Sequence, residues 1–228
     1  MSRNFKVRLC VGLGLLVIAL LGLYTFDGEP FRILYVLFSL VAGLELLSFF
    51  KRRNTFGNIL LAIAEIGFLY CGALFILQSD LVHIWYVILG VPGYDVFAYL
   101  FGIMIGGKVF KESRPFPHIS KNKTWEGTFC GLVIATALVA GLMAARGAFA
   151  TDWVYLLCGP LALMGDLFES FLKRKFDVKD SNEIVIKNPV FQWLEVLVGG
   201  SNGHGGFLDR IDSMAFAGTV LLIVVNLM

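Results

Sequence analysis

Charged residues are scarce in this sequence. Asp, Glu, Lys and Arg together make up 16% of its 228 residues, whereas a soluble domain has about 25%. Hydrophobic residues reach 57%, and the mean hydropathy is +0.78. So few polar side chains cannot cover a globule in water. The composition therefore excludes a soluble domain, and we expect a lipid bilayer to surround most of the chain.

Cysteine and histidine are also rare, at four and three residues. The cysteines stand alone in apolar stretches, with no CxxC pair among them, at Cys10, Cys71, Cys130 and Cys158. This excludes the usual sequence patterns of zinc sites and disulfide frameworks, so we interpret them as small buried apolar residues. The net charge of +2 argues neither for nor against nucleic acid, and no nucleic-acid partner is expected.

The sequence does contain a series of long apolar runs. A membrane-spanning helix needs about 20 mostly apolar residues, and seven stretches qualify. In the fourth, Pro92 and Gly93 leave open a broken helix or two short ones. The sequence therefore predicts an all-α, polytopic membrane protein with a single membrane domain, residues 1–228. The seven expected spans are Leu9–Phe26, Phe31–Phe50, Ile59–Gln78, Leu81–Gly106, Gly127–Arg146, Trp153–Leu172 and Phe207–Met228.

Basic residues alternate between the segments that connect these runs. They gather before the first run, between the second and third, in 107–126 and in 173–206, whereas the other connections hold only Arg32 and Arg146. An excess of Lys and Arg marks the cytoplasmic side of a membrane protein. We therefore expect a cytoplasmic N-terminus with a retained first helix, an external C-terminus, and two long cytoplasmic loops, 107–126 and 173–206.

Carboxylates cluster near the cytoplasmic ends of the last two expected spans. Asp166, Glu169 and Ser170 are spaced i, i+3, i+4, which places them on one helix face, and Asp209 and Asp212 are spaced i, i+3. Acidic residues in membrane helices are costly and mark functional sites. Together with the basic segment between them, they predict a site for a hard divalent cation and phosphates. Ion pairs that only anchor the helix ends remain the alternative.

Three motifs resemble the signature of the phosphatidate cytidylyltransferase family. They are Gly165-Asp-Leu-Phe-Glu-Ser-Phe-Leu-Lys-Arg174, Lys179-Asp-Ser181, and Gly203-His-Gly-Gly-Phe-Leu-Asp-Arg-Ile-Asp-Ser213. Upstream, the stretch from Asp95 to Gly127 is similar to the family's second conserved block. The segment 182–202 is an insertion relative to the family's spacing. In the third motif, the glycines around His204 let backbone N–H groups approach a phosphate closely.

The resemblance implies an enzyme that joins CTP to phosphatidate, releasing pyrophosphate and forming CDP-diacylglycerol, with Mg²⁺ and with a second cation left open. It implies a catalytic region in 81–228 after N-terminal helices in 1–80. We expect the cytoplasmic (inner) membrane, with the active site facing the cytoplasm. By the family pattern, the metal ligands are Asp166 and Asp209. Further catalytic residues are expected at Lys173, Arg174, Lys179, Asp180, His204, Arg210 and Asp212. Substrate-binding residues are expected at Asp95, Ser120, Lys123, Thr124, Trp125, Glu169, Ser170, Ser181, Gly205 and Gly206.

Two other functions remain open. A related CTP-using enzyme would act on a different lipid acceptor, such as an isoprenoid lipid phosphate or a lipid alcohol. An ion-coupled transporter would also hold intramembrane acids, but it would favour the bilayer midplane and repeat symmetry, which the sequence does not show. The expected partners are CTP, phosphatidate and the bilayer lipids, with a homodimer left open.

Overall fold

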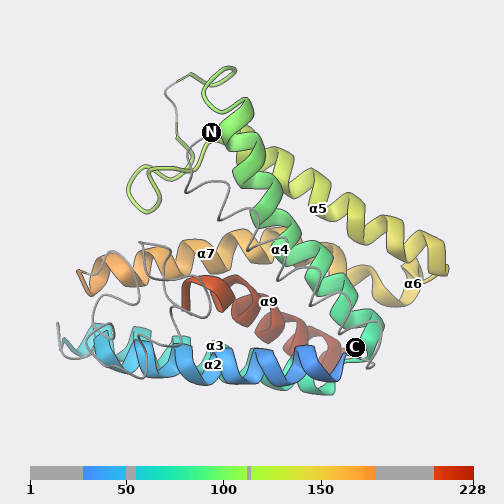
Figure 1. Ribbon diagram of the computed structural model, residues 1–228, viewed down its shortest axis with the longest axis horizontal. Helices are drawn as coiled ribbons and strands as arrows, with labels where there is room; N and C mark the ends of the chain where they lie inside the picture. Colours follow the sequence, from blue (N-terminus) through green and yellow to red (C-terminus); the bar gives the residue numbers. More distant parts are fainter. Residues whose placement is uncertain (1–27, 50–54, 112–113, 178–207) are drawn as a thin grey trace.

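The structure is a computed structural model that describes residues 28–49, 55–111, 114–177 and 208–228. Within these ranges every regular element is a helix (Figure 1), which confirms the all-α class. The elements are α2 (Glu29–Phe49), α3 (Phe56–Gln78), α4 (Leu81–Met104), α5 (Trp125–Arg146), α6 (Phe149–Asp152), the 3-10 helix η1 (Trp153–Leu157), α7 (Cys158–Lys175) and α9 (Leu208–Leu227).

Most of these helices have the length and composition of membrane spans. Large apolar side chains stay on the outside of the bundle, among them Leu40 (62% exposed) and Phe129 (67% exposed), as expected where lipid replaces water. The chain is therefore an integral membrane protein. The apolar part of α9, Ile211–Leu227, is shorter than a full span, and Leu9–Phe26 lies outside the described residues, so the count of seven stays a prediction. The five segments long and apolar enough to cross are Glu29–Leu47, Phe56–Gln78, Leu81–Met104, Trp125–Arg146 and Phe149–Lys175.

Pro92 lies inside α4, which runs as one helix from Leu81 to Met104. The break that Pro92 and Gly93 left open is thus absent from this helix. A proline removes one backbone hydrogen bond, yet membrane helices tolerate it where neighbouring helices pack against them. α4 has such neighbours, because it packs extensively on α5 and α7, and its Val91 and Tyr94 are completely buried.

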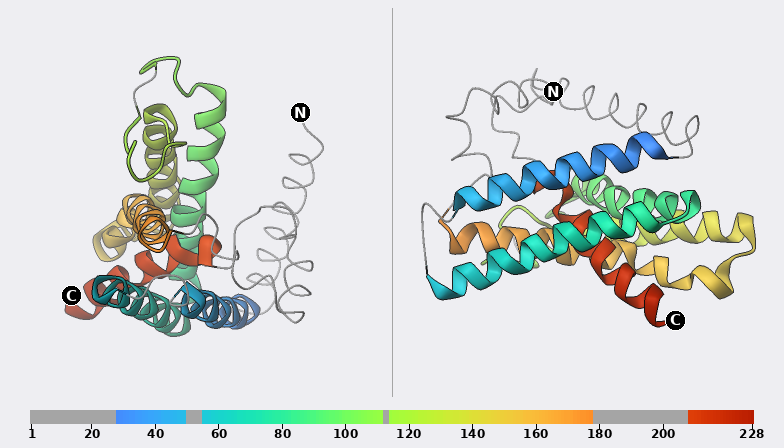
Figure 2. Two further views of the ribbon diagram at one scale, coloured as in Figure 1. Left: turned by 90° about the vertical axis from the view of Figure 1, so that its left-hand side faces the viewer. Right: turned by 90° about the horizontal axis from the view of Figure 1, so that it is seen from below.

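The helices α7 and α9 lie between two helix pairs. α2 and α3 pack together on one side and α4 and α5 on the other, as Figures 1 and 2 show. α9 contacts α3, α7 and α2, while α7 contacts α9, α4 and α5. The two helices that carry the predicted carboxylates are therefore the central pair of the described bundle.

α9 packs closely against both of its main neighbours. A Cβ atom added to Gly72 of α3 would lie 2.8 Å from the Cα of Ala215, and one added to Gly165 of α7 would lie 2.7 Å from the Cα of Ser213. Both distances are too short for two carbon atoms, so glycine is what lets these backbones approach. Gly165 and Ser213 are chain neighbours of predicted site carboxylates. The contact at Gly165 therefore brings α7 and α9 together at the level of their acids.

Gly72→Ala should destabilise the protein, because the added methyl group collides with the α9 backbone and overpacking typically costs about 1–3 kcal/mol. Gly67→Ala on the same helix is the matched control, since no atom lies within 4 Å of its added Cβ and alanine favours a helix. Thermal unfolding in detergent should show a lower midpoint for Gly72→Ala alone. Equal midpoints for the two variants would contradict the close α3–α9 packing.

Candidate active site

Three carboxylates from α7 and α9 converge in the structure. Asp166 and Glu169 lie on one face of α7 and Asp212 lies near the start of α9, with one oxygen of each within 4.8 Å of the others. Glu169 is 2% exposed and Asp212 6%, whereas the Asp166 side chain is 31% exposed. The i, i+3 spacing on α7 points its two acids to the same side. The cluster therefore opens toward its surroundings mainly through Asp166.

A lysine with little exposure joins the two helices. The Nζ of Lys173 lies 2.7 Å from an oxygen of Glu169 and 3.2 Å from an oxygen of Asp209. Glu169 is one turn away on α7, whereas Asp209 lies in the first turn of α9. One ammonium group thus links carboxylates of both helices. The role of Asp209 as a metal ligand stays a prediction.

A second lysine reaches the cluster from the loop between α4 and α5. Lys123 forms an ion pair with Asp166, and its Nζ lies 5.5 Å from the centre of the Tyr94 ring, which is a cation–π contact. Burial lowers the pKa of Lys123, but Asp166, Tyr94 and Asp95 together outweigh this effect, so the net pKa shift is upward. Lys123 therefore holds a permanent positive charge beside the most accessible acid of the cluster.

Two long-range contacts hold this loop in place. The Oε1 of Glu126 accepts hydrogen bonds from the backbone N–H groups of Val109 (2.9 Å) and Phe110 (3.0 Å). From α7, the Nε of Arg174 donates to the carbonyl oxygen of Ile119. The loop is thus fixed at its start by α5 and near its end by α7, which positions the lysine it carries.

Thr124 begins α5 as its N-cap. Its Oγ1 accepts a hydrogen bond from the N–H of Gly127 at 3.1 Å, which satisfies one of the unpaired donors of the first turn. Trp125 follows, 42% exposed, with its ring beside Phe110. These contacts give both residues a role in shaping the loop, and substrate binding by them stays a prediction. Substrate binding also stays a prediction for Asp95 on α4, Ser120 in the loop and Ser170 on α7.

Part of the predicted site lies outside the described residues. This applies to the insertion 182–202 and to the side chain of Arg210. The contacts above therefore account for the part of the site that α7, α9 and the α4–α5 loop carry. The other predicted residues outside the described ranges are Lys179, Asp180, Ser181, His204, Gly205 and Gly206.

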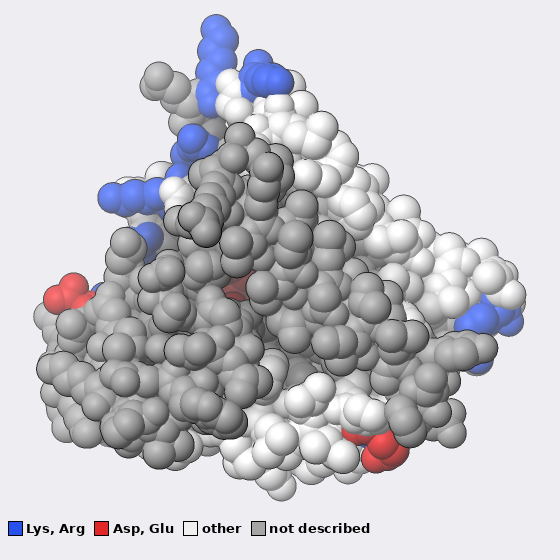
Figure 3. All heavy atoms as spheres, viewed as in Figure 1, with Lys and Arg blue, Asp and Glu red and all other residues white. Residues whose placement is uncertain are grey.

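Basic side chains gather at the end of the molecule where Lys123 lies. Figure 3 shows Lys and Arg side chains crowded around the loop between α4 and α5, while the flank formed by α4 and α5 is mostly uncharged. Such a field attracts a polyanionic substrate. The exposed members of this group in the loop are Lys108, Lys111, Arg114 and Lys121.

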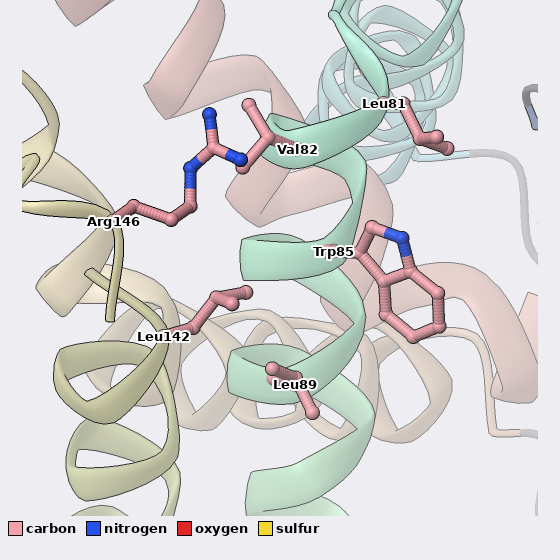
Figure 4. A pocket seen from close by; sticks show the side chains of 6 residues that line it. All are labelled: Leu81, Val82, Trp85, Leu89, Leu142 and Arg146. Atoms are coloured by element: carbon pink, nitrogen blue, oxygen red, sulfur yellow. The ribbon is translucent and has the colours of Figure 1, made fainter. Parts of the chain in front are cut away.

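A cavity of about 430 Å³ lies at the opposite end of α4 and α5. Its wall is mostly apolar, with the Arg146 guanidinium and the Trp85 indole as its polar groups, and Figure 4 shows side chains from both helices around it. The α4 residues belong to the first turns of that helix, before Tyr94, and none of the lining residues belongs to the carboxylate cluster. The cavity is therefore not part of the carboxylate cluster. It is lined by Leu81, Val82, Trp85, Leu89, Leu142 and Arg146.

Comparisons with known proteins identify the family. Residues 66–186 match the family model described as the cytidylyltransferase family. The chain belongs to the cytidylyltransferase family. A phosphatidate cytidylyltransferase of Helicobacter pylori strain J99 is 30% identical over 227 residues, covering 97% of this chain and 75% of that protein. One of Rickettsia felis is 35% identical over 136 residues, covering 53% of this chain and 51% of that protein. No solved structure matches the chain.

Membership of the cytidylyltransferase family makes the chain a nucleotidyltransferase. The ion-coupled transporter is thereby excluded as its function. The segment matched to the family contains Lys123, Asp166, Glu169 and Lys173, whereas α9 lies beyond it. The family model does not cover α9. The structure shows that α9 contributes its own carboxylates to the site formed by the matched segment.

Sequence reasoning did not single out the buried acids of α2, α3 and α5. Glu45 of α2 and Glu65 of α3 are 1% and 2% exposed, and Glu126 of α5 is 5% exposed. The rule that acids inside membrane helices mark function picks out Glu45 and Glu65 as readily as the acids of the last two spans. Glu126 stands at a span's edge, and its part in holding the loop follows only from the fold.

Lys173→Met should destabilise the protein by about 3–5 kcal/mol, because it leaves Glu169 and Asp209 without their shared cation in a site with little water. Adding Glu169→Gln to this variant should recover part of the loss. Lys121→Met, at an exposed loop position, is the control and should stay within about 0.5 kcal/mol of wild type. The midpoint of thermal unfolding in detergent is measured for all three variants. A midpoint for Lys173→Met equal to the control would show that the ion pairs contribute nothing.

Proposed function

We propose that the chain transfers CMP from CTP to phosphatidate, forming CDP-diacylglycerol and pyrophosphate. The names of its relatives from Helicobacter pylori and Rickettsia felis support this choice of acceptor. The observation that carries the proposal is the carboxylate cluster of α7 and α9, flanked by Lys123 and Lys173. Carboxylates for a metal ion and ammonium groups for phosphates are the side chains that a metal-bound nucleotide requires.

Mg²⁺ is the proposed cofactor of this site. Asp209 and the three converging carboxylates face two ammonium groups among the described side chains, which leaves an excess of negative charge. Within the described residues, the buried Oε1 of Glu169 has no hydrogen-bond partner. The donors are all carboxylate oxygens, the hard ligands that suit Mg²⁺, so Asp166, Glu169 and Asp212, with the predicted ligand Asp209, would hold it. The ion supplies charge neutralisation at the phosphate oxygens and the leaving group.

The two lysines are the proposed phosphate ligands. An ammonium group has three N–H donors, and Lys173 uses two of them on Glu169 and Asp209. The third can serve a phosphate oxygen. Lys123 lies beside the partly exposed Asp166, where an entering polyphosphate would compete for its charge. Each lysine can therefore bind substrate without a rearrangement of the helices.

The chemistry demands positioning more than proton transfer. A phosphate oxygen of phosphatidate attacks the α-phosphorus of CTP, so a P–O bond forms there, and the bond to the β-phosphate oxygen breaks with pyrophosphate leaving. A phosphate monoester has a second pKa of about 6, so the attacking oxygen needs no strong general base. Such transfers depend on alignment and charge neutralisation, and the acids and lysines of this site can contribute both.

The proposed location is the cytoplasmic face of the inner membrane. One substrate is a lipid and the other is dissolved in the cytosol, so they can meet only at the level of the lipid headgroups. The excess of Lys and Arg in the α4–α5 loop supports the cytoplasmic side. The carboxylate cluster and Lys123 then lie at the end of the bundle that CTP can reach.

Asp166→Asn and Asp209→Asn should each lower turnover at least about 100-fold, because a metal clamp is worth several kcal/mol and about 1.36 kcal/mol of barrier is tenfold in rate. The double variant should be little worse than either single one, since groups acting as a unit are not additive. The measurement is Mg²⁺-dependent formation of CDP-lipid from labelled CTP and phosphatidate at matched folded concentration.

Asp152→Asn is the matched control for these variants. Asp152 is a carboxylate with restricted access to solvent too, but it accepts a hydrogen bond from the Tyr86 hydroxyl at 2.9 Å, near the other end of the bundle. The turnover of the Asp152→Asn variant should stay near that of the wild type. Wild-type turnover in Asp166→Asn would remove that residue from the site. A product that carries a phosphate in place of CMP, or CDP-lipid formed only from another acceptor, would overturn the choice of reaction or of substrate.

Cysteine labelling tests the proposed orientation. In a background without the four native cysteines, a membrane-impermeant maleimide added to intact cells should label Thr151→Cys, which is exposed at the start of the α6–α7 segment. Lys121→Cys, exposed in the α4–α5 loop, should react only after the membrane is permeabilised. The reverse pattern would place the carboxylate cluster on the external face.

A further inference from the structure

Glu45 lies near the end of α2 and contacts the first residue of α9. Its side chain is almost fully buried, and its Oε2 accepts a hydrogen bond from the backbone N–H of Leu208 at 3.0 Å. The two residues are 163 positions apart in the chain. The contact therefore joins an N-terminal helix to the helix that carries Asp209 and Asp212.

The hydrogen bond satisfies a backbone N–H donor at the N-terminus of α9. The first N–H groups of a helix have no partner within the helix, and a buried N–H without a partner is costly. Leu208 is completely buried, so water does not serve its N–H. Helices usually take this cap from the residue just before them, whereas α9 takes a carboxylate from another helix. The negative charge also interacts favourably with the positive end of the helix dipole.

The position of this N–H determines the position of the acids that follow. Leu208 is adjacent to Asp209 and about one turn before Asp212. The glycine contacts with α3 and α7 hold α9 at Ala215 and Ser213, more than one turn beyond Leu208, so a shift of the first turn along the helix axis is opposed by contacts of that turn itself, including the ion pair of Asp209 with Lys173. A directed hydrogen bond opposes that shift. A displacement of about 1 Å in an active site can cost about 100-fold in rate.

We propose that Glu45 is a positioning residue of the active site. It holds the first turn of α9 where Asp209 and Asp212 meet the acids and the lysine of α7. The proposal rests on the proposed function. It deepens that function by assigning a role to a residue outside the segment that matches the family model, residues 66–186. Glu45 acts through α9 and has no assigned contact with substrate.

The experiment compares Glu45→Ala and Glu45→Gln with Ser39→Ala, in the full chain in lipid nanodiscs. Glutamine keeps an oxygen that can accept the Leu208 hydrogen bond, whereas alanine removes it. Ser39 is the matched control, because it is a buried polar residue of the same helix whose hydroxyl donates to the Tyr35 carbonyl within α2. The two readouts are amide hydrogen exchange in the first turn of α9, and kcat and KM for CTP.

Glu45→Ala should speed amide exchange in the first turn of α9 about fivefold, as expected for a lost cap. Its kcat should fall about 10- to 100-fold, with a smaller change in KM, because misplaced acids impair the reacting geometry more than nucleotide binding. Glu45→Gln should retain most of the exchange protection and most of the kcat. Ser39→Ala should match wild type in both readouts.

Unchanged exchange in Glu45→Ala would overturn the proposal, and so would faster exchange with wild-type kcat, since Glu45 would then be a stabilising cap alone. Should the alanine variant not fold, Glu45→Asp decides, because the shortened side chain keeps the charge but cannot reach Leu208 without moving α9. Wild-type kcat in that variant would contradict positioning. If the wild-type protein makes no CDP-lipid at all, the proposed function fails, and the exchange comparison still decides whether Glu45 holds α9.

Discussion

The close approach of α9 to its neighbours at two glycines is the constraint on which the rest of the site depends. Gly165 admits the backbone of Ser213 on the α7 side, and Gly72 admits that of Ala215 on the α3 side. Aspartate side chains are short, so an acid of α9 can share a site with acids of α7 only when the two backbones nearly touch. A larger residue at Gly165 would separate the acids of α7 and α9 without altering any of them, and one at Gly72 would displace α9 from α3.

Acids brought together in this way require positive charge. Carboxylates removed from water are costly unless they are paired and hydrogen-bonded. Lys173 pairs with acids on both helices, and Lys123 arrives from the α4–α5 loop to pair with Asp166. The negative charge that remains among the described side chains is the physical reason to propose a divalent cation here, and the cation together with the two lysines would attract the substrate phosphates. Glu45 meets the same requirement differently, because its carboxylate accepts a hydrogen bond from the Leu208 N–H at the start of a helix, where the helix dipole is positive.

Much of the fold was predictable because a spanning helix leaves a signal about 20 residues long. The expected span Gly127–Arg146 agrees closely with α5. On α7, the spacing of Asp166 and Glu169 was enough to place them on one face. Contacts between helices leave no comparable signal, since they depend on where distant segments meet. The hydrogen bond from Leu208 to Glu45, across most of the chain, therefore needed the structure.

Metal rescue at Asp166 tests the central claim, that the acids of α7 and α9 form the metal-dependent site of CMP transfer. Asp166→Cys replaces a hard oxygen ligand by a soft thiolate, which binds Mg²⁺ poorly and softer ions well. We expect turnover with Mg²⁺ to fall at least about 100-fold and Cd²⁺ to restore part of it in this variant, but not in Asp166→Ala. Wild-type turnover of Asp166→Cys with Mg²⁺, or equal responses of both variants to Cd²⁺, would contradict the account.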